Sequence, residues 1–158
     1  MVHLLPIPHE ALMVCGVAPL TTYPFGDLEI SFPAASTGDI ECLEVKPYDR
    51  NHPQASAPQQ TEKYWQIIAT KSSSQPAADY NATMTATVPF TLATADGLCR
   101  YLGSGMSWDC AADSFDAAQK KITRQNITQF SDWAAAQAAT AGSVFICLSS
   151  NDQFPRKL

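Results

Sequence analysis

One stretch of strict two-residue alternation constrains the fold of this chain more than any other feature. Between Tyr80 and Leu92 the even positions are all apolar: Ala82, Met84, Ala86, Val88, Phe90 and Leu92. A period of two places successive side chains on opposite faces of a β-strand. Threonine suits such a strand because its branched Cβ favours extended backbone. The stretch therefore predicts one strand with an apolar inner face and a polar outer face that carries Thr83, Thr85 and Thr87.

Shorter apolar runs predict further strands on both sides of this one. They are Ala11–Val17, Asp27–Phe32, Asp39–Lys46, Lys63–Thr70, Leu98–Leu102 and Ser143–Leu148. Leu43 is out of phase within its run, which indicates a β-bulge. The five residues 34–38 suit a hairpin loop between the second and third runs. Ala11–Val17, a short run within the N-terminal segment, and Leu98–Leu102 are candidates for one further strand beside the other five. We therefore expect a mainly antiparallel sheet of about five to six strands.

The segment 114–141 is predicted to form one long α-helix. No proline occurs between Pro89 and Pro155. Asp113 or Ser114 is suited to cap the first turn, and Gly142 is a common stop signal. The chain is thus predicted to be α+β, with this helix of the C-terminal half packed on one face of the sheet.

Two proline-rich segments are expected to lack regular structure, or to have little. Residues 1–25 contain four prolines, which disfavour a helix and predict an extended N-terminal arm. Residues 47–61 contain three more among polar side chains and predict a long loop. With these segments included, the 158 residues are expected to form a single domain, 1–158, with no need of a metal or disulfide.

Charged residues are scarce and unevenly distributed. They make up 16% of the chain, below an average of about 25%. A surface of Ser, Thr, Gln, Asn and Ala is buried at a subunit contact with less desolvation cost than Lys or Glu. Residues 1–45 carry six acidic residues and no Lys or Arg, which favours contacts between copies or reflects acidic residues along exposed strands. The net charge of −5 argues against nucleic-acid binding.

The five cysteines form no CxxC pair and have no zinc-ligand spacing. Four of them lie within or beside apolar runs, where reduced, buried cysteine is common. The sequence therefore predicts free thiols in a reducing compartment. No secretory signal or apolar run long enough to cross a bilayer is found, so no membrane contact is expected.

No motif of known chemistry occurs, and the chain is predicted not to be an enzyme. The histidines at positions 3, 9 and 52 match no metal-ligand geometry, so no metal and no cofactor are expected. Cys110, which precedes the predicted helix, and His52, in a polar loop, are the two candidates for a reactive group. Each also has a simpler interpretation, as a buried structural cysteine and as a loop residue.

The leading functional hypothesis is a structural subunit of a large homo-oligomeric assembly, most concretely a bacteriophage head or tail component. Its partners would be further copies and other structural subunits, and its location the virion, or the cytoplasm if the protein is not viral. The alternative is a small cytosolic inhibitor or immunity-type protein, and a small enzyme is third. The candidate interface residues are Leu4, Leu5, Ile7, Tyr23, Phe25, Tyr48, Arg50, His52, Thr83, Thr85, Thr87, Lys120, Lys121 and Arg124.

Overall fold

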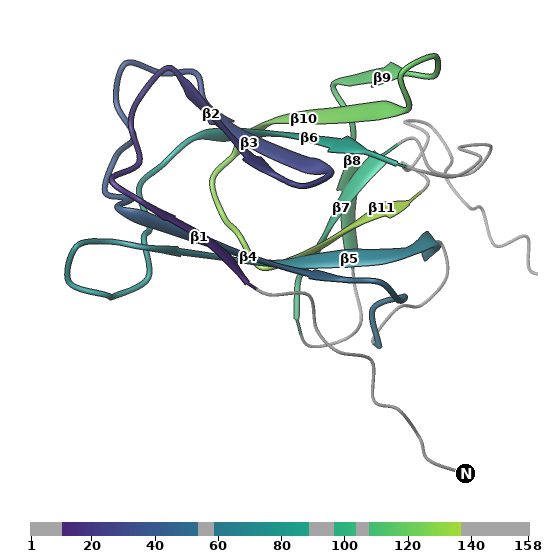
Figure 1. Cartoon of the computed structure of the whole chain (residues 1–158), viewed down its shortest axis with the longest axis horizontal. Coiled ribbons are helices and arrows are strands. Elements are labelled where there is room, and N and C mark those ends of the chain that lie inside the picture. The colour runs from purple at the N-terminus through teal and green to yellow at the C-terminus, as the bar shows by residue number, and fades with distance from the viewer. Residues whose placement is uncertain (1–10, 54–58, 89–96, 104–107, 137–158) are drawn as a thin grey trace, which may run out of the picture.

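The fold is a sandwich of two antiparallel β-sheets (Figure 1). The computed structural model describes residues 11–53, 59–88, 97–103 and 108–136, and within these ranges all regular structure is β-strand. The six-stranded sheet has the order β1-β4-β5-β11-β7-β8, and the five-stranded sheet has the order β2-β3-β6-β10-β9.

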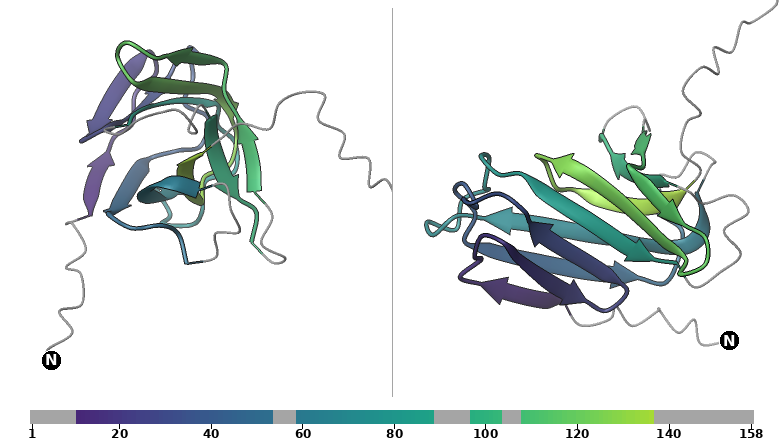
Figure 2. Two further views of the ribbon diagram at one scale, coloured as in Figure 1. Left: turned by 90° about the vertical axis from the view of Figure 1, so that its right-hand side faces the viewer. Right: turned by 90° about the horizontal axis from the view of Figure 1, so that it is seen from above.

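Each sheet draws its strands from distant parts of the chain. The six-stranded sheet contains β1 (Leu12–Cys15), β4 (Cys42–Tyr48), β5 (Gln59–Thr70), β11 (Asp132–Ala136), β7 (Gly97–Tyr101) and β8 (Trp108–Ala111). The five-stranded sheet contains β2 (Thr21–Phe25), β3 (Leu28–Phe32), β6 (Ala82–Thr87), β10 (Lys121–Ile127) and β9 (Ser114–Asp116). The chain changes sheet after β1, β3, β5, β6, β8 and β10, so its path alternates between the two layers (Figure 2).

The core lies between the sheets and follows from the alternation within the strands. Each sheet turns its apolar positions toward the other, because successive side chains point to opposite faces. The largest fully buried side chains come from both layers: Trp65, Trp133, Phe32, Leu28, Ile30, Leu43, Ile67, Met84, Leu98 and Ile122. Burial of apolar area on this scale is the main favourable term in folding.

The alternating stretch forms β6, and the prediction of its inner face is confirmed where the structure describes it. Ala82, Met84 and Ala86 are completely buried. The threonines are partly covered rather than freely exposed, and the hydroxyls of Thr85 and Thr123 lie 3.0 Å apart. Residues 89–92 lie outside the described residues.

The predicted helix over 114–141, and with it the α+β class, is wrong. Residues 114–136 form β9, β10 and β11, which pair with strands of both sheets. The carboxylate of Asp116 accepts hydrogen bonds from the N–H groups of Ala118 and Gln119, and Lys120 has φ 57°, which together form a tight turn instead of a helix start. A register shift follows Arg124, where Asn126 has φ 55°. Residues 137–141 lie outside the described residues.

Several other expectations about the strands also need correction. Segment 34–38 is no hairpin loop, because β3 pairs with β2 and β6 while β4 belongs to the other sheet. The register of β4 with β5 is continuous at Leu43, which is fully buried, so there is no bulge at that residue. Residues 11–25 of the predicted arm contain β1 and β2, and the predicted loop 47–61 contains the end of β4 and the start of β5. The arm residues 1–10 and the run Ser143–Leu148 lie outside the described residues.

The prediction of free thiols is wrong for four of the five cysteines. Cys15 is bonded to Cys42, and Cys99 is bonded to Cys110. Both pairs are directly opposite one another on neighbouring strands, β1 with β4 and β7 with β8. Such bonds persist in oxidising surroundings, which argues against the predicted reducing compartment. Among the described residues, no helix is long and apolar enough to cross a membrane.

Candidate functional site

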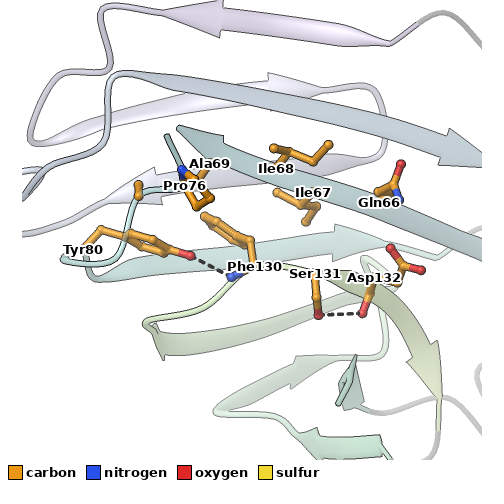
Figure 3. Close-up of a pocket in the computed structure, with 10 residues that line it drawn as sticks. Gln66, Ile67, Ile68, Ala69, Pro76, Tyr80, Phe130, Ser131 and Asp132 are labelled. Carbon is orange, nitrogen blue, oxygen red and sulfur yellow. Dashed lines mark hydrogen bonds between the residues drawn. The ribbon is translucent and has the colours of Figure 1, made fainter. Parts of the chain in front are cut away.

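A cavity of about 270 Å³ opens where the connection from β10 reaches β11 (Figure 3). Seven of its ten described lining residues are of apolar or aromatic type: Ile67, Ile68, Ala69, Pro76, Ala77, Tyr80 and Phe130. Three polar residues, Gln66, Ser131 and Asp132, complete the lining. Figure 3 shows Gln66 and Asp132 together at one end, and Tyr80 at the other.

The cavity exists because β11 meets β5 only from Asp132 onward. Asp132 is opposite Gln66 in the register, and the N–H of Ile67 donates to the main-chain oxygen of Ser131 at 2.9 Å. Before this point the chain is held aside by Tyr80, whose hydroxyl accepts the N–H of Phe130 at 2.7 Å while the two rings stack. Burial raises the pKa of the Tyr80 phenol above its ordinary value of 10.0, because the phenolate would be poorly solvated.

The carboxylate of Asp132 on β11 is held in place by His52, which follows β4 on the other side of β5 in the sheet order. The distance between His52 Nε2 and Asp132 Oδ2 is 2.7 Å. His52 follows β4 and is only 5% exposed, whereas the Asp132 side chain is 24% exposed. A bond between an imidazole and a carboxylate orients both groups.

Aromatic rings pack around His52 on the outer face of the six-stranded sheet. Its ring centroid lies 4.9 Å from Tyr64, 4.8 Å from Tyr101 and 5.1 Å from Trp108. Tyr48 extends this aromatic cluster by stacking on Tyr64, with ring centroids 4.5 Å apart. The cluster therefore buries the histidine and leaves Asp132 as its link to the cavity.

This arrangement contains no assembled nucleophile. The hydroxyl of Ser131, next to Asp132 in the chain, donates to the main-chain oxygen of Tyr101 at 3.0 Å. Cys110 is in a disulfide and has no thiol to activate, so the hypothesis of a reactive Cys110 is wrong. The described residues contain no group of three or more side chains suited to hold a metal ion.

Arg124 does not form a surface patch with Lys120 and Lys121, because it lies between the two sheets. Its guanidinium donates to the main-chain oxygens of Leu98 at 2.9 Å and Asp109 at 2.8 Å, and it pairs with the Asp109 carboxylate. Only 14% of the Arg124 side chain is exposed. Lys120 is exposed in the turn between β9 and β10.

The remaining predicted interface residues fall into separate places. Phe25 is buried in the core, and the half-buried Tyr23 accepts the N–H of Ala18 with its hydroxyl. Arg50 lies over the ring of Tyr48, so the structure brings these two together with His52. The three threonines belong to the other sheet. Leu4, Leu5 and Ile7 lie outside the described residues.

Sequence reasoning missed Asp132, Tyr64, Tyr101 and Trp108. Tyr64 lies in a predicted strand, but Asp132 lies inside the predicted helix, where the sequence indicates no cavity. His52 and Asp132 are 80 residues apart, and no motif connects them. Strand periodicity would have found the aromatic residues, but only the pairing of β5, β11 and β7 brings them together.

Strand β1 presents a second candidate site, an apolar edge. It ends the six-stranded sheet, and Leu12 and Met13 are 43% and 63% exposed. The Cα atoms of Cys15 and Cys42 are 4.1 Å apart, a spacing typical of a non-hydrogen-bonded pair. Because orientations alternate, the main-chain groups of Met13 and Cys15 point away from β4. In the sheets that the structure describes, no strand pairs with that side.

The other three sheet edges carry features that discourage pairing with another chain. Strand β2 contains Pro24, strand β8 contains Asp109, and strand β9 contains Asp116. Proline and charged residues on an edge disfavour the addition of a further strand. Among the described edges, β1 alone has neither proline nor charge.

Comparison with known proteins identifies no relative. No family model matches the chain, and neither the curated proteins nor the solved structures include a significant match.

Proposed function

We propose that this protein is a structural subunit of a homo-oligomeric assembly whose copies join at strand β1. The observation that supports the proposal is the uncharged, exposed edge formed by Leu12–Cys15. Such an edge offers a row of main-chain donors and acceptors to a further strand. Exposed apolar side chains beside that row add a hydrophobic contact to the pairing.

The geometry of β1 favours an antiparallel pair related by a two-fold axis. Residues with outward main-chain groups pair with one another, so Met13 of one copy faces Cys15 of the next. Val14 then lies opposite Val14 of the second copy, and the two six-stranded sheets become continuous. A two-fold contact is self-complementary, as is usual for homo-oligomers. The bond from Cys15 to Cys42 holds the short edge strand in place for this contact.

The more specific hypothesis of a bacteriophage head or tail component remains a prediction, because two-layer β-sandwiches serve many functions. An inhibitor or immunity-type protein would use the acidic residues of segment 1–45 against a basic target. Three of those acids already have cationic partners: Asp27 pairs with Lys63, Asp39 with Lys71 and Glu44 with Lys46. This internal pairing leaves less acidic charge for a basic target.

The variant Met13→Pro tests the proposal. Proline is tolerated on an edge where the N–H points to solvent, but it removes the donor that the second copy needs. We expect the wild-type chain to be oligomeric in sedimentation velocity and Met13→Pro to be monomeric at equal concentration. The circular dichroism and melting temperature of Met13→Pro should stay close to those of the wild-type chain measured at a dilution where it is monomeric.

The matched control is Thr22→Pro on the edge strand β2. Thr22 and Pro24 are two residues apart, so their main-chain nitrogens point to the same side of β2. Because proline already occupies position 24, the fold should also tolerate proline at position 22. This variant should remain oligomeric. A wild-type chain that stays monomeric at all concentrations would contradict the assembly proposal as a whole. An oligomer that survives Met13→Pro would contradict the β1 contact.

A further inference from the structure

The cavity at the β5–β11 junction has one charged residue in its described lining, Asp132. One of its carboxylate oxygens accepts from His52, and no described residue donates to the other. No Lys or Arg is among the described lining residues. The end of the cavity near Asp132 is therefore electronegative, and it disfavours anionic ligands.

One further feature of this end suits a hydrogen-bond donor. His52 holds the carboxylate in one orientation, because its ring is enclosed by Tyr64, Tyr101 and Trp108. The side chain of Gln66 lies beside Asp132, with its amide nitrogen toward the carboxylate and its amide oxygen turned away (Figure 3). An ammonium group has three donors, and the second carboxylate oxygen of Asp132 is an acceptor for it.

The rest of the cavity is small and is lined mainly by residues of apolar or aromatic type. Ile68, Pro76 and Ala77 contribute to its wall, and Phe130 adds an aromatic ring that stacks on Tyr80. The volume of about 270 Å³ lies below the range of about 300–1,000 Å³ that is typical of drug-sized ligands. A compact ligand with a short hydrocarbon tail would fill it.

We propose that this cavity binds a small primary alkylammonium ion, with its charged head at Asp132 and its tail along Ile68, Pro76 and Phe130. His52 is a positioning residue in this site, since it acts on the ligand through the Asp132 carboxylate. The proposal is independent of the assembly through β1, because β4 and β5 separate β1 from β11 in the same sheet.

Titration of the full chain with n-butylammonium chloride, followed by ¹⁵N amide NMR, tests the site. We expect saturable shifts at Ile67, Ile68, Phe130 and Asp132, with a dissociation constant in the millimolar range, because so few ligand atoms make contact. Asp132→Asn keeps the size of the side chain and removes its charge, and it should weaken binding at least about tenfold. n-Butanol, of similar shape but neutral, should bind at least about tenfold more weakly than the cation to the wild-type chain.

Two further variants separate loss of the site from loss of the fold. Ala77→Leu fills part of the cavity without touching the carboxylate, and it should also weaken binding while the spectrum outside the cavity is preserved. Glu29→Gln makes the same charge change on an exposed position of β3 and should bind like the wild type. Equal binding of n-butanol, unchanged affinity in Asp132→Asn, or the absence of saturable shifts at the cavity would each overturn the proposal.

Discussion

At the scale of single residues, Gly38 shows how one position joins two crossings between the sheets. It lies in the connection from β3 to β4 with φ +66°, and a Cβ there would be 1.7 Å from the main-chain oxygen of Asp79. The neighbouring Asp39 accepts the N–H groups of Asp79 and Ala78. These bonds hold the pKa of the Asp39 carboxyl below its ordinary value of 3.8. No side chain fits at Gly38 without separating the two segments.

Gly38→Ala should therefore lower the free energy of unfolding by more than the positive φ alone would, because the added Cβ also meets the main-chain oxygen of Asp79. Gly26→Ala is the matched comparison, because Gly26 has φ +70° but no atom within 4 Å of an added Cβ. We expect about 1 kcal/mol of destabilisation for Gly26→Ala and at least about 2 kcal/mol for Gly38→Ala. Urea unfolding of both variants measures the difference. Equal losses would show that the approach to Asp79 relaxes easily.

At the scale of elements, each edge of the six-stranded sheet is fastened by a disulfide. Strands β1 and β8 are short and stand at the edges of the described sheet, and a disulfide joins β1 to β4 and β8 to β7. Edge strands gain main-chain hydrogen bonds on one side only and are prone to fray. The disulfides compensate for this weakness. At β1 the bond from Cys15 to Cys42 keeps the edge strand ordered for the proposed contact between copies.

Removing either disulfide should destabilise the fold, and the longer loop should matter slightly more. The bond from Cys15 to Cys42 spans 27 residues and the bond from Cys99 to Cys110 spans 11. Loop-closure entropy gives about 3.5 and about 3 kcal/mol respectively, for replacement of each pair by alanine. Denaturant unfolding without reductant measures both. Only the Cys15/Cys42 replacement should also weaken self-association. If the folded wild-type chain reacted with thiol reagents at all of its cysteines, the two disulfides would be contradicted.

At the scale of the whole molecule, Arg124 connects the two layers. It belongs to β10 of the five-stranded sheet, and its guanidinium binds main-chain and carboxylate oxygens at β7 and β8 of the other sheet. It also lies over the ring of Trp133 on β11, with 5.1 Å between the guanidinium carbon and the ring centroid. The sandwich is thus held by a charged contact in addition to its apolar core.

Arg124→Met should lower the free energy of unfolding by about 2–3 kcal/mol, because Leu98 and Asp109 lose a charged donor in a mostly buried place. Arg100→Met is the control. Arg100 donates to Gln129 at 2.8 Å on the exposed side, so its loss should amount to less than about 1 kcal/mol. Thermal and urea unfolding of the two variants provide the test. Similar losses would mean that Arg124 does not couple the sheets.

The sequence alone determined which face of β6 is buried. In β6 the apolar residues recur with a period of two, and this local signal placed Ala82, Met84 and Ala86 correctly in the core. It is reliable because side-chain direction alternates along any strand, whatever its neighbours are. Periodicity gave no position for the candidate interface residues, of which Phe25 lies in the core and Arg124 lies between the sheets.

Tertiary structure alone decided the class of segment 114–136, the partners of each strand and both candidate sites. Alanine favours helices in isolation, yet Ala134, Ala135 and Ala136 are buried in β11, which pairs with β5 on one side and β7 on the other. The two disulfides, and the contact of His52 with Asp132, likewise join residues that no local pattern connects. Local periodicity is encoded within a few residues, whereas strand pairing depends on contacts between distant segments that form only in the folded chain.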